Sequence, residues 1–138
     1  MKNVNKIIKH MLLVLPVIFM MGCGLGKSNP ETFIKDGVAE FNKQCPQRID
    51  EITVMTKASY ENHRLTFYYE LDPGEAADIL MDIEEQVIKE ALEDEIKNSS
   101  DPNVETLFKN LKEDNGSLYY MYSVNDGTGR SRKIKVDY

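Results

Sequence analysis

The 138-residue sequence has few of the side chains from which metal sites and nucleophilic active sites are built. It contains two cysteines and two histidines, whereas zinc sites need several cysteine or histidine ligands at close spacing. Glycine is also sparse: Gly127 and Gly129 lie between two expected strands and do not lead into a helix, as a phosphate-binding loop must. We therefore expect no metal and no cofactor.

Positive charge is scarce as well, since 17 basic residues stand against 23 acidic ones. Residues 1–22 carry three lysines and no acid, so the remaining 116 residues hold 14 basic and 23 acidic side chains and a formal net charge of −9. Nucleic-acid binding requires a basic footprint, so we expect none. Anionic lipids and other acidic polymers repel such a domain over about a Debye length.

The apolar run Met11–Met21 is too short to cross a membrane as a stable helix. A spanning helix needs about 20 apolar residues, whereas this run contains Pro16 and is followed by Gly22. Three basic residues precede it, namely Lys2, Lys6 and Lys9. A basic leader followed by a short apolar block is the pattern of a secretory signal.

The run Phe19-Met20-Met21-Gly22-Cys23 closes the apolar block. This arrangement resembles the signal peptide and lipobox of a bacterial lipoprotein precursor. The resemblance implies cleavage before Cys23, a diacylglyceryl thioether on its sulfur, and often a further acyl chain, such as palmitate, on the new amino terminus. Two or more acyl chains give lasting membrane attachment, whereas one chain does not.

The same resemblance implies a place in the cell envelope. Gly24 follows Cys23, where an Asp holds some lipoproteins in the inner membrane, so the outer membrane is favoured in a cell that has one. Two alternatives stay open: an ordinary secreted protein in which Cys23 is incidental, and a retained, uncleaved anchor. The expected domain division is a signal peptide at 1–22, the lipid-bearing Cys and linker at 23–29, and one domain at 30–138.

The first half of that domain predicts a helix, a hairpin and a second helix. Asn29 and Pro30 provide an N-cap and a first-turn proline, and the expected helix runs to about residue 44. Alternating patterns at 49–60 and 65–71 predict two strands joined by a turn. Asp72 and Glu75 then suit a capping box at the start of one long helix over 75–97.

The second half predicts a helix over 102–111 and strands at 118–124 and 134–138. Hairpins with one apolar face need a helical layer over that face. We therefore expect an α+β fold in which a four-stranded antiparallel sheet of two hairpins is covered on one side by three helices. The expected order is α-β-β-α-α-β-β, and the pattern leaves the strand order open.

The aromatic strand 65–71 follows a segment at residues 42–53, which reads Asn-Lys-Gln-Cys-Pro-Gln-Arg-Ile-Asp-Glu-Ile-Thr. Together they resemble a pattern in small uncharacterised bacterial envelope proteins, in which a helix ends at Asn and Lys shortly before Pro. The resemblance implies no activity and supports only the fold.

Catalysis has one candidate set, Cys45 with His63 and Asp50, because a thiol nucleophile needs a base and an orienting group. Cys45 falls on the apolar stripe of the first helix, and His63 falls in a hairpin turn. A lone cysteine on such a stripe is typical of a small buried hydrophobe. We expect these residues to lie apart and the protein not to be an enzyme.

Tyrosines on the expected strands provide a candidate interaction surface. Alternation sends Tyr68, Tyr119 and Met121 to the face opposite the core. Tyrosine joins a large contact area to a polar tip, which suits recognition, although exposed aromatic side chains also stabilise cross-strand pairs. Arg130 and Arg132 begin a basic terminal strand, which either guards a sheet edge or docks an acidic partner.

These features predict a non-enzymatic, lipid-anchored envelope protein that binds another protein through the outer sheet face or the last strand. The expected interaction residues are Tyr68, Tyr119, Met121, Arg130 and Arg132. The alternative function is a carrier or sensor of a small apolar ligand, held between sheet and helices behind Phe67, Tyr69 and Tyr120.

Overall fold

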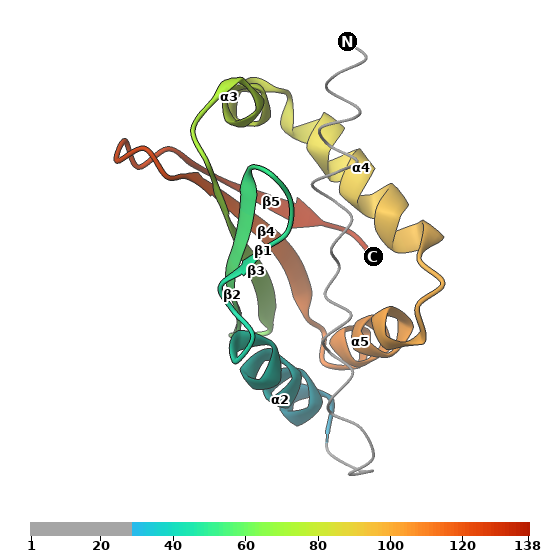
Figure 1. Cartoon of the computed structure of the whole chain (residues 1–138). Coiled ribbons are helices and arrows are strands. Elements are labelled where there is room, and N and C mark those ends of the chain that lie inside the picture. The colour runs from blue at the N-terminus through green and yellow to red at the C-terminus, as the bar shows by residue number, and fades with distance from the viewer. Residues whose placement is uncertain (1–28) are drawn as a thin grey trace.

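A five-stranded mixed sheet with helices packed on one face forms the part of the chain that the computed structural model describes, residues 29–138 (Figure 1). The predicted signal peptide, Cys23 and the residues up to 28 lie outside it. In the described part, no helix has the length and apolar character needed to cross a membrane. In chain order the elements are α2 (Pro30–Asn42), β1 (Gln47–Arg48), β2 (Thr53–Glu61), β3 (Arg64–Leu71), α3 (Glu75–Asp82), α4 (Glu85–Asn98), α5 (Pro102–Glu113), β4 (Ser117–Val124) and β5 (Ser131–Val136).

The sheet order is β1-β2-β3-β4-β5, and β3 and β4 run parallel, with Arg64 opposite Ser117 and Leu71 opposite Val124. The α+β class is confirmed, but the prediction of four antiparallel strands is wrong. Parallel neighbours need a long crossover, and α3, α4 and α5 supply it by returning the chain to the end where β3 began. The alternation of apolar and polar residues shows which face of a strand is buried, but it does not show whether two neighbouring strands run parallel or antiparallel.

Strand β2 contains an irregularity that sequence periodicity does not show. Its register with β3 shifts between Met55 and Lys57. An unbroken alternation ending at the buried Ala58 would place Val54 and Thr56 inside, but these two are partly exposed, and Met55 is fully buried. A bulge adds one residue to one strand and re-aims the side chains around it, so the alternation changes phase there.

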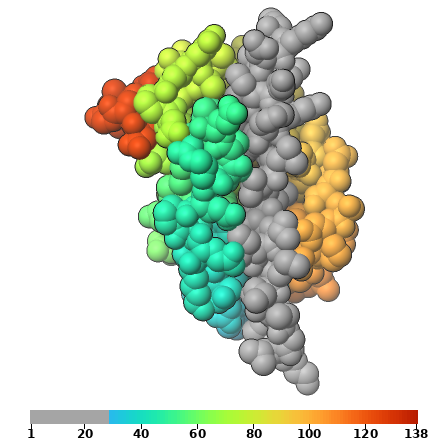
Figure 2. All heavy atoms as spheres, viewed as in Figure 1, coloured from blue at the N-terminus to red at the C-terminus, as the bar shows by residue number. Residues whose placement is uncertain are grey.

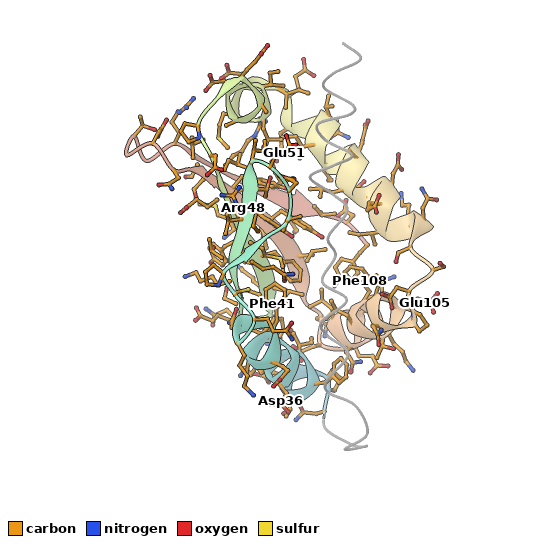
Figure 3. The ribbon with its side chains drawn as sticks, viewed as in Figure 1. Asp36, Phe41, Arg48, Glu51, Glu105 and Phe108 are labelled. Atoms are coloured by element: carbon orange, nitrogen blue, oxygen red, sulfur yellow. The ribbon has the colours of Figure 1, made fainter. Side chains whose placement is uncertain are left out.

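The predicted long helix over 75–97 is two helices, because Ile83 and Glu84 have extended backbone with ψ values of 152° and 134°. The predicted capping box is also wrong, since Gly74 is the N-cap of α3 without a side-chain bond. Asp72 instead pairs with Arg48 of β1, whose Nη1 lies 2.9 Å from Oδ2. Arg48 also donates to the carbonyl of Glu51, which lies beside it in Figure 3.

Helix α2 begins as predicted, with the Asn29 side chain accepting a hydrogen bond from the amide of Thr32 at 2.8 Å. It ends at Asn42, two residues before the predicted end. The Asn42 side chain accepts from the amide of Ala58 at 2.8 Å and donates to its carbonyl at 2.9 Å, so it joins the helix end to β2. Such long-range bonds are invisible to local periodicity.

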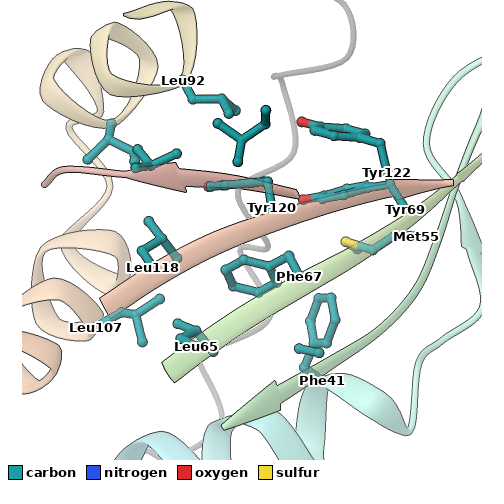
Figure 4. Packing of buried hydrophobic residues seen from close by; sticks show 14 of the residues in the cluster. Phe41, Met55, Leu65, Phe67, Tyr69, Leu92, Leu107, Leu118, Tyr120 and Tyr122 are labelled. Carbon is teal, nitrogen blue, oxygen red and sulfur yellow. The ribbon is translucent and has the colours of Figure 1, made fainter. Parts of the chain in front are cut away.

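The core lies between the sheet and the helices and is built around aromatic rings (Figure 4). Phe41 of α2 meets Phe67 edge-on at a centroid distance of 5.8 Å, and Tyr69 stacks with Tyr120 and Tyr122 at 6.0 and 5.3 Å. Phe41 and Phe108 point from their helices toward the interior, whereas Asp36 points away (Figure 3). Burial of each large apolar side chain contributes about 1.5–3 kcal/mol.

Candidate interaction surface

One face of the sheet carries the helices, and we call the opposite face the open face. Successive strand side chains point to opposite faces. Tyr69, Tyr120 and Tyr122 are 3%, 3% and 2% exposed on the helical face. Their neighbours Tyr68, Tyr119 and Met121 are partly exposed, so the structure brings these three predicted residues together on the open face.

The strand register arranges the open face in two adjacent rows. One row reads Lys57, Tyr68, Met121 and Lys133 across β2, β3, β4 and β5. The next row reads Ser59, Thr66, Tyr119 and Lys135. Neighbouring strands lie about 4.8 Å apart, so a lysine stands at both ends of the first row with a flat tyrosine and methionine surface between them.

Each open-face tyrosine holds a lysine over its ring. The Nζ of Lys57 lies 4.7 Å from the ring centroid of Tyr68, and the Nζ of Lys133 lies 4.7 Å from that of Tyr119. At exposed sites, such cation–π contacts are worth about 0.5–1 kcal/mol. The contacts therefore hold the ammonium groups above the sheet without neutralising their charge.

The two predicted arginines do not join this surface. Arg130, in the turn between β4 and β5, pairs with Asp78 of α3 at 2.8 Å and with Asp126 at 2.9 Å. Figure 2 shows this turn against α3. Hydrogen bonds from Thr128 and then from Arg130 lower the pKa of Asp126 to about 2. Arg130 therefore closes the turn and fastens it to the helix.

Arg132 lies on the helical side of β5, opposite the buried Tyr122. Its Nη1 donates to the carbonyls of Leu80 and Met81 at 2.9 and 3.2 Å. These carbonyls belong to the last turn of α3, where helix carbonyls lack partners within the helix. Arg132 thus supplies donors to the end of α3, where the predicted long helix is interrupted.

The interaction residues expected from the sequence do not include Lys57 or Lys133. Lys133 follows from the alternation of β5, in which Ile134 and Val136 are buried. Lys57 precedes the buried Ala58 in β2, so alternation sends its side chain outward, but alternation does not show which residue lies beside it. Pairing with Tyr68 across the hairpin is the signal that locates it.

The residues of the hypothetical catalytic set lie apart. Cys45 follows α2, is partly buried against the core, and precedes β1, which pairs with Val54 and Met55 near the start of β2. His63 lies beyond the other end of β2. The Asp50 side chain accepts bonds from the amides of Ile52 and Thr53, both at 2.8 Å. Burial raises the pKa of the Cys45 thiol, which opposes thiolate formation.

His63 has a different partner, Asp114, at the end of α5. The His63 Nδ1 lies 2.9 Å from the Asp114 Oδ2, which also accepts a hydrogen bond from the Tyr60 hydroxyl. The hydrogen bond with Asp114 raises the pKa of His63. The hydrogen bonds from Tyr60 and then His63 lower the pKa of Asp114. The cluster ties the β2–β3 turn to α5.

Residues 29–131 match a protein family described as a domain of unknown function. The chain belongs to this family, DUF8479. The domain also resembles the crystal structure of a predicted secreted protein from Pseudomonas aeruginosa, with a TM-score of 0.57 and 14% sequence identity over 81% of this chain and 96% of that one. At this identity the likeness shows the fold alone. No curated protein matches the chain.

We expect replacement of His63 by Asn to lower stability more at pH 5.5 than at pH 8.5. A raised histidine pKa contributes stability that is fully present below the unfolded-state value of about 6.5 and is lost as pH rises through the folded-state value. The lowered Asp114 pKa keeps that partner charged above about pH 4. Asn tolerates the positive φ of 59° at this position.

Thermal unfolding of both proteins at the two pH values measures this difference. In an Asp114→Asn background, the His63→Asn change should lose its pH dependence. An equal loss of stability at pH 5.5 and pH 8.5 in the wild-type background contradicts the assignment.

Arg132→Met should lower the free energy of unfolding by about 1–2 kcal/mol, because it leaves the carbonyls of Leu80 and Met81 without a donor. Urea unfolding provides the measurement. The exposed Lys135→Met change on the same strand is the matched control and should stay within about 0.5 kcal/mol of wild type. Similar stability for Arg132→Met and the control would refute the capping role.

Proposed function

We propose that this chain is a non-enzymatic, lipid-anchored protein of the bacterial cell envelope whose domain binds another protein through the open face. The observation that carries the binding role is the row of partly exposed tyrosine and methionine side chains on a sheet whose other face is fully covered. Aromatic and methionine side chains are enriched at protein interfaces.

The envelope location is supported by the amino-terminal sequence and by the comparisons. The basic leader and apolar block precede Cys23, and the family match begins six residues after it, at residue 29. The described likeness to a predicted secreted bacterial protein agrees with export. A lipid on Cys23 would hold the domain at the membrane, with the open face presented to neighbouring envelope proteins.

The alternative, a carrier of a small apolar ligand, receives less support. That ligand was expected behind Phe67, Tyr69 and Tyr120, but these rings are 0%, 3% and 3% exposed and contact one another. Phe67 and Tyr120 lie at a centroid distance of 5.7 Å, and Tyr69 and Tyr120 lie at 6.0 Å. Rings in such contact occupy the space that a ligand would need.

Labelled palmitate should enter the wild-type chain in growing bacteria and should not enter a Cys23→Ser variant, because the thioether needs the sulfur. Fluorography of the immunoprecipitated protein gives the result. Cys45→Ser is the matched control and should keep the label. Lack of label in the wild type, or equal label in Cys23→Ser, contradicts the anchor.

The double variant Tyr68→Thr/Tyr119→Thr should lose at least about tenfold of the partner recovered by cross-linking in living cells. A tenfold loss corresponds to 1.4 kcal/mol, which is within the range of two truncated aromatic contacts at an interface. Threonine keeps strand propensity, so the fold is expected to persist. Quantitative mass spectrometry of the cross-linked products provides the measurement.

Val87→Ala is the control, because Val87 is a large hydrophobic residue on α4 that is 36% exposed. It should leave partner recovery unchanged. Circular dichroism melts should show that both variants are folded. Undiminished recovery with a folded double tyrosine variant would remove the open face from consideration.

A further inference from the structure

Four cations of the open face have no carboxylate partner. Lys57, Arg64, Lys133 and Lys135 make no ion pair with any residue between 29 and 138. Elsewhere in that range, Lys35, Lys43, Arg48, Lys89 and Arg130 pair with carboxylates, whereas Lys97, Lys109, Lys112 and Arg132 do not. Despite the large excess of acids in the chain, these four open-face cations are available to an external anionic group.

This surface also has the opposite sign to the molecule. The part of the chain after residue 22 has a formal net charge of −9. On the open face, the four cations stand against two strand acids, Glu61 and Glu70. Local positive potential on an acidic protein attracts anionic groups to that surface and repels them from the rest.

The shape of the surface indicates the size of the partner. Its side chains lie in flat rows across β2, β3, β4 and β5. Of two hollows in the described part, one follows α3, and the other lies between the end of β5 and the end of α5 and includes Lys135 as its one residue from the rows. Small ligands bind in concave sites, so the flat rows suit a macromolecular partner.

We propose that the open face binds an extended, acidic polypeptide segment of the partner protein, and this inference rests on the proposed function. Carboxylates of the segment meet Lys57 and Lys133, and its apolar side chains lie on Tyr68, Met121 and Tyr119. In an extended chain, side chains on one side repeat every 6.6–6.8 Å or so. Lys57 and Lys133 stand three strand spacings apart across the row, about 14 Å, which is close to two such repeats, so two acids with one apolar side chain between them on the facing side match the lysines.

A narrow segment fits this surface better than an anionic bilayer does. The Debye length is about 8 Å at physiological ionic strength. A segment lying on the rows meets mainly the open-face cations within that distance. A bilayer plane also approaches the acidic surroundings of the rows, and the net charge of −9 then opposes contact. The charge distribution therefore favours a polypeptide over a lipid surface.

The test uses the full chain in a nonionic detergent and a fluorescein-labelled 12-residue peptide in which every second residue is alternately Glu and Val, with Ser between, so that Glu and Val lie on the same side of the extended chain. Fluorescence anisotropy should show binding that weakens as sodium chloride is raised. The same peptide with Gln in place of Glu should bind at least about tenfold more weakly, because the opposed charges are gone.

Lys57→Glu/Lys133→Glu should weaken binding of the acidic peptide by at least about tenfold, which is 1.4 kcal/mol and is consistent with two exposed charge contacts and added repulsion. Lys97→Glu/Lys109→Glu makes the same change of net charge on α4 and α5 and should stay within about twofold of wild type. Melting curves confirm that both variants are folded, and Lys57→Gln/Lys133→Gln serves as a milder substitute if the reversal unfolds the domain.

No binding of the peptide, or equal weakening by the two reversals, overturns the inference. If inorganic polyphosphate binds as tightly as the peptide and its binding is weakened by the same lysine reversal, the partner is not specifically a polypeptide. If phosphatidylglycerol vesicles bind in preference to the peptide, the partner is a membrane surface and the proposed segment is wrong. If the lysine reversal leaves cellular cross-linking intact while the double tyrosine variant abolishes it, the proposed function stands and the acidic partner is wrong.

Discussion

Burial of one side of the sheet beneath the helices is the constraint on which the rest of the structure depends. Phe67, Tyr69, Tyr120 and Tyr122 form a continuous aromatic layer across β3 and β4. Because strand side chains alternate, placing these rings inside places Tyr68, Tyr119 and Met121 outside. The open face is therefore a direct consequence of core formation, and its residues are free to serve recognition.

Local signals in the sequence were sufficient for most of the elements but not for their assembly. The N-cap at Asn29 and the alternation of β3 and β4 were read correctly because a few neighbouring residues determine them. The direction of β4 relative to β3 and the break at Ile83 depend on residues distant in the chain. Arg132, which caps α3, lies about fifty positions after the carbonyls that it binds.

The same division applies to the candidate surface. The outward positions of Tyr68, Tyr119 and Lys57 follow from strand alternation, whereas the contact of Lys57 with Tyr68 depends on the cross-strand register. Arg130 and Arg132 have the charge expected of docking residues, yet their hydrogen bonds go to α3 and to the β4–β5 turn. The basic cluster around β5 thus has two kinds of residue: arginines that bind other parts of the domain, and lysines that are available to a partner.

The parallel pairing of β3 with β4 also sets an order of events for the newly made chain. The amino-terminal hairpin can form early, but its inner edge stays unpaired until the three helices and β4 have been synthesised. Contacts between segments so distant in sequence form slowly, and unpaired strand edges invite aggregation meanwhile. A chain translocated across a membrane before it folds would close its sheet only after most of its length had emerged.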